Sequence, residues 1–322
     1  MALRIVFCGT PEFAVPSLKR LIAEPDFEIS GVVTQPDRPS GRGQETRPSA
    51  VKQAAAQAGL PVFQPEKIRS DEGWEYFRRI APDAVVIIAY GQIIPQRLIA
   101  IPRLGWINLH ASLLPKYRGA APINWAIING EERTGLTTMQ IDAGLDTGPI
   151  LAQQDYGIGY EVTAPQLTFL LSEWGAPMMV DTLRRLASGE ITPLPQDDAQ
   201  ASFAPMLKKQ DGRMDWSLDS TQLYNRIRGL QPWPGAFTSF LGKRCQIWAR
   251  PVVNPTEIDY LRQFAASPPG GTIVALGHEV LIACARGTAL RLEFAQLEDR
   301  KRVTAREFAV GVRLTAGERF GG

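Results

Sequence analysis

The chain has 322 residues, 44% of them hydrophobic and 21% charged, and a formal net charge of +2, an ordinary globular composition with room for two domains. The longest apolar run, residues 84–90, is too short to span a bilayer, and no cleavage pattern follows the apolar start, so neither a transmembrane helix nor a signal peptide is expected. Three scattered cysteines and two distant histidines argue against a zinc site and suit a cytoplasmic protein.

Strands and helices are predicted to alternate from residue 3 to residue 186. The expected strands are residues 3–8, 28–34, 84–89 and 105–109, and the expected helices are residues 13–22, 49–58, 122–128 and 163–186. This alternation favours an α/β fold, an open and mostly parallel sheet with helices on both faces. Ligands bind such sheets beyond the carboxyl ends of the strands, where Tyr90, Gly91, Asn108 and His110 fall.

Asn108 and His110 are the most informative pair in the chain. Residues two apart in a strand point to the same face, so both polar side chains project side by side from an otherwise apolar strand. An amide donor can polarise a carbonyl oxygen, and an imidazole can move a proton near neutral pH. Together they suit acyl transfer to a nitrogen nucleophile. A structural hydrogen-bonded pair is the alternative.

Asp142 and Asp146 flank Gly144 in a glycine-rich loop. Both residue types are common in turns, and the sequence alone places neither carboxylate beside His110. A second irregular segment, residues 35–48, interrupts the α/β pattern. Its proline, glycine and arginine content predicts a mobile, solvent-exposed insertion, which is either a surface loop without a role or a binding loop.

The rear of the chain is basic. From Lys208 onward there are 17 Lys and Arg against 11 Asp and Glu, a net charge of +6, whereas residues 1–207 have 18 against 22, a net charge of −4. Three proline residues mark a linker over residues 189–205, and apolar stretches at 246–249, 272–276, 280–283 and 289–294 predict a small β-barrel. Trp216, Trp233 and Trp248 are expected in its core.

Basic clusters lie in this rear part. They are Lys208-Lys209, Lys243-Arg244 and Arg300-Lys301-Arg302. Each cluster alone is more simply a solvated face, but together they suit a nucleic-acid backbone.

Two motifs carry a resemblance to a known family. The pattern Asn-x-His-x-Ser-Leu-Leu-Pro at residues 108–115, followed by Asp-Ala-Gly-Leu-Asp-Thr-Gly-Pro at residues 142–149, is similar to the signature of folate-dependent formyltransferases. The resemblance extends over nearly the whole chain to the members that formylate methionyl-tRNA. It implies a Rossmann-like catalytic domain (1–188), a linker (189–207) and an oligonucleotide-binding-like β-barrel that binds tRNA (208–322).

The resemblance also implies substrates and site residues. The formyl donor would be 10-formyltetrahydrofolate, the acceptor the amine of methionine on initiator methionyl-tRNA, with no metal, membrane or obligate protein partner. Asn108, His110 and Asp146 would be catalytic, with Asp146 orienting the imidazole, holding its tautomer and tuning its basicity. Folate would lie along Ala89, Tyr90, Gly91, Ser112, Leu113, Leu114 and Pro115.

Contacts to tRNA are implied for the basic residues. They are Arg38, Arg42, Arg47, Lys208, Lys209, Lys243, Arg244, Arg300, Lys301 and Arg302. Family members often carry lysines where this chain has Gln44-Glu45-Thr46, so this loop has less positive charge for phosphate contacts than theirs.

Other functions remain open. One is another folate-dependent formyl enzyme, either a formyltransferase for a small purine precursor or a formyltetrahydrofolate hydrolase. The basic rear argues against both, because a small acceptor needs no such surface. The other is a non-catalytic tRNA-binding protein, against which the intact Asn108, His110 and Asp146 argue.

Overall fold

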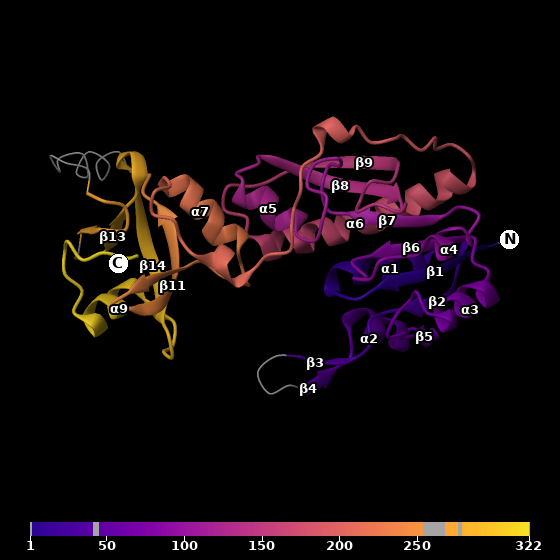
Figure 1. Ribbon diagram of the computed structural model, residues 1–322, viewed down its shortest axis with the longest axis horizontal. Helices are drawn as coiled ribbons and strands as arrows, with labels where there is room; N and C mark the ends of the chain where they lie inside the picture. Colours follow the sequence, from indigo (N-terminus) through magenta and orange to yellow (C-terminus); the bar gives the residue numbers. More distant parts are fainter. Residues whose placement is uncertain (1, 41–44, 254–267, 276–278, 322) are drawn as a thin grey trace. The chain divides into compact units, whose positions relative to one another are not determined.

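The computed structural model describes residues 2–40, 45–253, 268–275 and 279–321 (Figure 1). The chain packs into two compact units. Unit 1 comprises Met1–Pro122, Arg133–Gly157 and Gln166–Pro205, and unit 2 comprises Ile123–Glu132, Ile158–Pro165 and Met206–Gly322. Within the part of the chain that the structure describes, no helix is long and apolar enough to cross a membrane.

A seven-stranded sheet forms the centre of unit 1, in the order β5-β2-β1-β6-β7-β8-β9 (Figure 1). Its strands are β1 (Leu3–Gly9), β2 (Phe27–Val33), β5 (Val62–Phe63), β6 (Ala84–Ile88), β7 (Trp106–His110), β8 (Arg133–Gln140) and β9 (Ile150–Gly157). The pairings from β5 to β7 are parallel, whereas β8 and β9 add to β7 in antiparallel fashion. The mostly parallel α/β prediction is confirmed. No strand was predicted at β8 or β9 because neither is a continuous apolar run.

The helices of unit 1 cover both faces of this sheet. They are α1 (Val15–Ala23), α2 (Ala50–Gln57), α3 (Asp71–Ile80), α4 (Gln96–Ile99) and α6 (Ala164–Ala187), with short 3-10 turns η1 (Glu12–Ala14) and η2 (Asp198–Gln200). Phe77 of α3 and Leu98 of α4 pack in one cluster with Trp106 of β7. On the other face, a Cβ on Gly175 of α6 would come within 2.4 Å of the Leu109 side chain. Strand β7 is therefore enclosed from both sides.

Unit 2 is built around a curled antiparallel sheet that forms a half-barrel. Its strands are β10 (Phe237–Phe240), β11 (Lys243–Pro251), β12 (Ile273–Ala275), β13 (Val280–Ala283), β14 (Ala289–Leu297) and β15 (Val303–Thr304), and its helices are α5 (Pro122–Ile128), α7 (Ser220–Gly229) and α9 (Ala305–Val312), with 3-10 turns η3 (Lys209–Gly212) and η4 (Ala285–Gly287). The four predicted apolar stretches coincide with β11 to β14. Ile247, Leu292, Phe308 and Phe320 pack in the core between the sheet and its helices.

Two short pieces from before residue 166 belong to unit 2, and both contact α7. The Asn124 side-chain amide of α5 donates to the Gly229 carbonyl at 2.7 Å. The buried Arg228 guanidinium donates to the carbonyls of Gly159 (3.3 Å) and Val162 (2.9 Å). These bonds satisfy polar groups that would otherwise be buried without partners.

In its described parts, residues 35–40 and 45–48, the predicted insertion is more regular than its composition suggested. Strands β3 (Arg38–Ser40) and β4 (Glu45–Arg47) form a two-stranded antiparallel ribbon in which Arg38 lies opposite Arg47 (Figure 1). At its base, the Asp37 carboxylate contacts the Lys52 ammonium and accepts a hydrogen bond from Gln64 at 2.8 Å. These contacts hold the pKa of Asp37 below its usual range.

Candidate active site

Strand β7 carries the two predicted catalytic side chains to its carboxyl end. It lies between β6 and β8 in the middle of the sheet. Asn108 and His110 alternate with Ile107 and Leu109, so they share the face of Trp106. Both are buried, at 9% and 6% exposure. Buried polar groups at a central strand end need partners or a ligand.

The His110 imidazole is held from one side by the backbone. Its Nε2 lies 2.9 Å from the Tyr117 carbonyl oxygen. A carbonyl only accepts, so Nε2 carries the proton and Nδ1 is the nitrogen with a free lone pair in the neutral ring. Nδ1 lies 3.7 Å from Asp146 Oδ2, too long for a hydrogen bond but close enough for an ion pair with a protonated ring.

This geometry revises one expected role of Asp146. The resemblance assigned the choice of tautomer to this carboxylate, but in the structure the Tyr117 carbonyl selects it. Asp146 instead offers a negative charge beside Nδ1.

Asp146 and Asp142 have different surroundings. Asp146 Oδ2 accepts the Gly119 backbone N–H at 2.8 Å and faces His110. The Asp142 carboxylate accepts the Thr147 hydroxyl at 2.7 Å and the Gly144 N–H at 3.0 Å, so it closes its own loop. The structure therefore brings Asp146 to His110 and leaves Asp142 as a turn residue.

The Asn108 amide, unlike the His110 and Asp146 side chains, lacks a hydrogen-bond partner among the described residues. Its amide atoms are not among the fully buried side-chain atoms that lack a partner, so the amide is accessible at the end of the strand, where a ligand can meet it. Its N–H groups are thus available to a carbonyl oxygen next to the imidazole.

The predicted folate loop is anchored to the neighbouring strands. The Thr137 hydroxyl of β8 donates to the Ser112 carbonyl at 2.7 Å and accepts the Leu114 N–H at 3.1 Å. Gln153 of β9 donates to the Leu114 carbonyl at 2.8 Å. Ser112 is buried and its hydroxyl donates to the Lys116 carbonyl at 2.6 Å. Leu113 and Pro115 are partly exposed, so the loop presents these side chains to a ligand.

The turn after β6, residues 89–91, exposes backbone peptide groups at the predicted folate site. Ala89 and Gly91 are exposed and have φ values of +47° and +89°. The carbonyl of Tyr90, whose side chain is buried between them, accepts from Thr10 and Gln35, both at 3.1 Å. Left-handed backbone on either side of an anchored residue exposes peptide groups at the carboxyl end of β6.

The predicted tRNA residues fall into two groups. Arg38 and Arg47 lie on the β3–β4 ribbon of unit 1, both exposed, with Arg38 3.5 Å from Glu66. Arg42 and Gln44 lie outside the described residues. In unit 2, the exposed members are Lys208, Lys209, Lys243, Arg300, Lys301 and Arg302.

Two of the unit 2 arginines lie on aromatic rings. Arg244 is centred 3.9 Å from the Phe237 ring. Arg302 lies 4.3 Å from the Trp248 ring and 4.1 Å from the Phe294 ring. The expectation that Trp216 lies in the core is confirmed, but it is wrong for Trp233, which is 56% exposed, and for Trp248, which is half-buried on the sheet surface.

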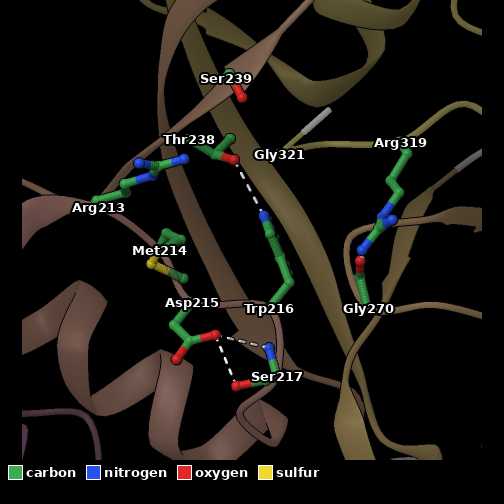
Figure 2. A pocket seen from close by; sticks show the side chains of 10 residues that line it. All are labelled: Arg213, Met214, Asp215, Trp216, Ser217, Thr238, Ser239, Gly270, Arg319 and Gly321. Carbon is green, nitrogen blue, oxygen red and sulfur yellow. Dashed lines mark hydrogen bonds between the residues drawn. The ribbon is translucent and has the colours of Figure 1, made fainter.

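A hollow of about 640 Å³ lies in unit 2 (Figure 2). Arg213, Arg319 and Asp215 line it, and the Trp216 indole N–H donates to the Thr238 hydroxyl at 3.0 Å within it. None of the predicted catalytic side chains is among its lining residues. We therefore do not assign the chemistry to this hollow.

Comparison with known proteins gives the family. Residues 3–183 match the family model described as formyl transferase, and residues 206–313 match that of the formyl transferase C-terminal domain. Proteins named methionyl-tRNA formyltransferase from Solibacter usitatus and Geobacter metallireducens are 50% and 48% identical to the chain, over 319 and 320 residues, and each alignment covers 99% of both chains. The chain belongs to the methionyl-tRNA formyltransferase family.

Solved structures share the fold. The sugar 3N-formyl transferase WlaRD, solved with dTDP and 5-N-formyl-THF, has a TM-score of 0.66 and 18% identity, covering 94% of this chain and 100% of its own. The methionyl-tRNA formyltransferase from Clostridium thermocellum has a TM-score of 0.53 and 17% identity, covering 78% of this chain and 94% of its own. At these identities the likeness shows the fold alone.

Three contacts at this methionyl-tRNA formyltransferase site could not be predicted from residue types in the sequence. Tyr117 and Gly119 act through backbone groups, which carry no side-chain signature, although they directly follow the Leu-Leu-Pro turn. Gln196 contacts the Asp146 loop from the predicted linker, a segment without any motif. Among the described residues, no group of three or more His, Cys, Asp or Glu side chains is placed to hold a metal ion.

Proposed function

We propose that this protein transfers the formyl group of 10-formyltetrahydrofolate to the free amine of methionine on initiator methionyl-tRNA. The observation that carries the proposal is the pairing of His110 with Asp146 at 3.7 Å beside the unpartnered amide of Asn108. Family membership supplies the reaction class. We also propose that the protein acts in the cytoplasm, where charged initiator tRNA is used for translation.

The chain's residues suit each charge that develops in this reaction. The neutral amine attacks the formyl carbon, and the negative charge on the formyl oxygen is stabilised by the Asn108 amide. His110 Nδ1, which has a free lone pair, takes the proton that the amine loses. Asp146 balances the positive imidazolium that results. When the bond to the folate nitrogen breaks, His110 returns the proton to that nitrogen.

The donor is assigned to the two backbone-rich segments that flank this site. Ala89 and Gly91 expose peptide groups after β6, and the 112–115 loop is held rigid by Thr137 and Gln153. A flat heterocycle with donors and acceptors on its edge can pair with such backbone groups. We propose that these segments hold the folate, with the formyl group directed toward Asn108 and His110.

The tRNA is assigned to the basic residues of both units. Arg244, Gln246 and Trp248 alternate along β11 with the buried Cys245 and Ile247, so they face away from the core of unit 2. Arginines that rest on rings keep N–H edges free for phosphate oxygens, and exposed rings can stack on bases. We propose that this aromatic–arginine face and the neighbouring lysines bind the tRNA backbone.

The experiment that tests the function separates it from the alternatives. The protein is incubated with 10-formyltetrahydrofolate and, in turn, charged initiator tRNA, charged elongator methionyl-tRNA and no tRNA. We expect formylmethionine with initiator tRNA, less with elongator tRNA, and no formate without tRNA. Formate release without tRNA would instead indicate a hydrolase, and tRNA binding without any transfer a non-catalytic protein.

A further inference from the structure

The segment that follows α6 is bound along the candidate active site. Leu194 and Ile150 exchange two backbone hydrogen bonds of 2.8 Å. Further on, the Arg118 N–H donates to the Ser202 carbonyl at 2.9 Å, and the Ala204 N–H donates to the Arg118 carbonyl at 2.7 Å. We call residues 194–204 the strap. It lies entirely within unit 1.

Gln196 of the strap contacts the loop that carries Asp146. Its amide Nε2 donates to the carbonyl of Asp146 at 2.8 Å and to that of Gly148 at 2.7 Å. Its Oε1 accepts from Arg118, at 3.1 Å from Nε and 2.8 Å from Nη2. One side chain thus joins the Asp146 turn to Arg118.

Arg118 is buried, with a side chain only 5% exposed, and its Nη2 also donates to Asp198 Oδ1 at 2.7 Å. Its two chain neighbours hold the catalytic pair directly. The Tyr117 carbonyl accepts from His110 Nε2, and the Gly119 N–H donates to Asp146 Oδ2. The hydrogen bonds of Arg118 therefore fix the position of the 117–119 backbone, which contacts the strap, the His110 imidazole and the Asp146 carboxylate.

The Asp146 turn needs such support because of its backbone. Asp146 has a φ of +54°, in the left-handed region that residues with a Cβ rarely adopt. A conformation of this kind persists only where the surroundings impose it. The two amide hydrogen bonds from Gln196 act on the carbonyl of this residue and on the end of the same turn.

We propose that Gln196, braced by Arg118, is a positioning residue that holds Asp146 against His110. The inference rests on the proposed function, since it assigns the role to the same catalytic pair. It gives Gln196 a role in placing the catalytic carboxylate, beyond the strap's place in the chain as the connection to unit 2.

The test uses variants that separate the two halves of the Gln196 side chain. Gln196→Met removes all its hydrogen bonds at nearly constant volume. Gln196→Glu keeps an acceptor for Arg118 and loses the amide that donates to Asp146 and Gly148. Gln200→Ala is the matched control, because Gln200 lies on the same strap and donates to Asp197 on the surface.

For both Gln196 variants we expect kcat to fall by up to about 100-fold, the effect of misplacing a catalytic group by roughly 1 Å. KM for donor and tRNA should change little, and Gln200→Ala should match the wild type. In an Asp146→Asn background, Gln196→Met should cost little more, because the group it positions is already lost. Full additivity of the two losses, or wild-type kcat in Gln196→Met, would overturn the proposal.

A second readout does not depend on activity. Hydrogen exchange of the backbone amides in residues 141–149 should accelerate in Gln196→Met and Gln196→Glu and stay unchanged in Gln200→Ala. Faster exchange in a protein that proves unable to transfer formyl groups would sink the proposed function and leave the positioning role intact. Unchanged exchange in both Gln196 variants would overturn the positioning role itself.

Discussion

At the scale of single residues, three side chains have different tasks in the proposed mechanism. In the proposed mechanism, Asn108 donates hydrogen bonds to the formyl oxygen, His110 accepts a proton at Nδ1, and Asp146 supplies a charge 3.7 Å from that nitrogen. These tasks are separable by substitution, because the Tyr117 carbonyl holds His110 and the Gly119 N–H holds Asp146, while the Asn108 amide forms a hydrogen bond with none of the described residues.

Replacing Asn108 with Ala should lower turnover by about 10²–10³-fold, the usual cost of removing one donor from a developing oxyanion. Thermal stability should hold, since among the described residues no hydrogen bond is lost with the amide. Steady-state formylation and a melting curve measure the two quantities. Turnover above about a third of the wild-type value would show that Asn108 does not contact the reacting carbonyl.

The two loop carboxylates should differ in importance. Asp146→Asn should reduce turnover strongly, because a neutral amide no longer balances an imidazolium at Nδ1. Asp142→Asn should reduce it much less, since an amide oxygen can still accept from Thr147 or Gly144. A side-by-side comparison of kcat for the two variants checks this ranking, and the reverse order would mean that Asp142 is the functional carboxylate.

At the scale of elements, the site forms where β7, the 112–119 loop, the Asp146 turn and the strap meet. Gly119 shows how closely they approach. Its φ is +125°, and a Cβ there would lie 2.6 Å from the Ala204 carbonyl oxygen of the strap. Any side chain at this position must displace backbone.

Gly119→Ala should therefore destabilise the protein by about 2–4 kcal/mol, combining left-handed strain with overpacking. Gly189→Ala has a φ of +78° but nothing within 4 Å, so it should cost only the strain, about 1 kcal/mol. Gly157→Ala, with open space and ordinary φ, serves as the neutral reference. Denaturant unfolding measures all three. Equal stability of Gly119→Ala and Gly189→Ala would refute the close approach.

The sequence predicted these elements unevenly, for physical reasons. Strands β1, β6 and β7 are buried on both faces and are therefore largely apolar runs in the sequence. Strand β8 is buried but contains three threonines, and β9 is an edge strand, so neither shows a clear hydrophobic pattern in the sequence.

The site was predicted only as far as side-chain chemistry allowed. Asn108 and His110 follow from alternation along one strand, and Asp146 from the family resemblance. The Tyr117 carbonyl acts through the backbone seven residues from His110, and the Gly119 N–H and Gln196 meet Asp146 from 27 and 50 residues away. Nothing local to the segment of Gln196 indicates its contact with Asp146.

At the scale of the whole molecule, net charge differs between residues 1–207 and residues 208–322. The net charge of +6 from Lys208 onward, against −4 before it, favours the binding of a polyanion by residues 208–322. Within the Arg300-Lys301-Arg302 cluster, the Arg302 guanidinium rests on the rings of Trp248 and Phe294.

Neutralising this cluster with glutamine should weaken tRNA binding for initiator and elongator alike. When a phosphate contact is lost, fewer counterions are released on binding. The slope of log affinity against log salt concentration should therefore decrease in magnitude by roughly 0.7–0.9 per contact. Affinity measured at several salt concentrations checks the slope. Arg286→Gln, which removes an exposed cation paired with Asp219, is the control. An unchanged slope in the cluster variant would return these residues to a solvated face without a role.

The central claim, that His110 moves the proton in formyl transfer to methionyl-tRNA, is tested most directly by single turnover. Enzyme in excess over charged initiator tRNA is mixed with 10-formyltetrahydrofolate, and formylmethionine is followed in time for wild type and His110→Ala. We predict transfer by the wild type and a rate about 10²–10⁴-fold lower in the variant, with tRNA affinity retained. An equal rate in the two proteins, or no formylmethionine from the wild type, would contradict the account.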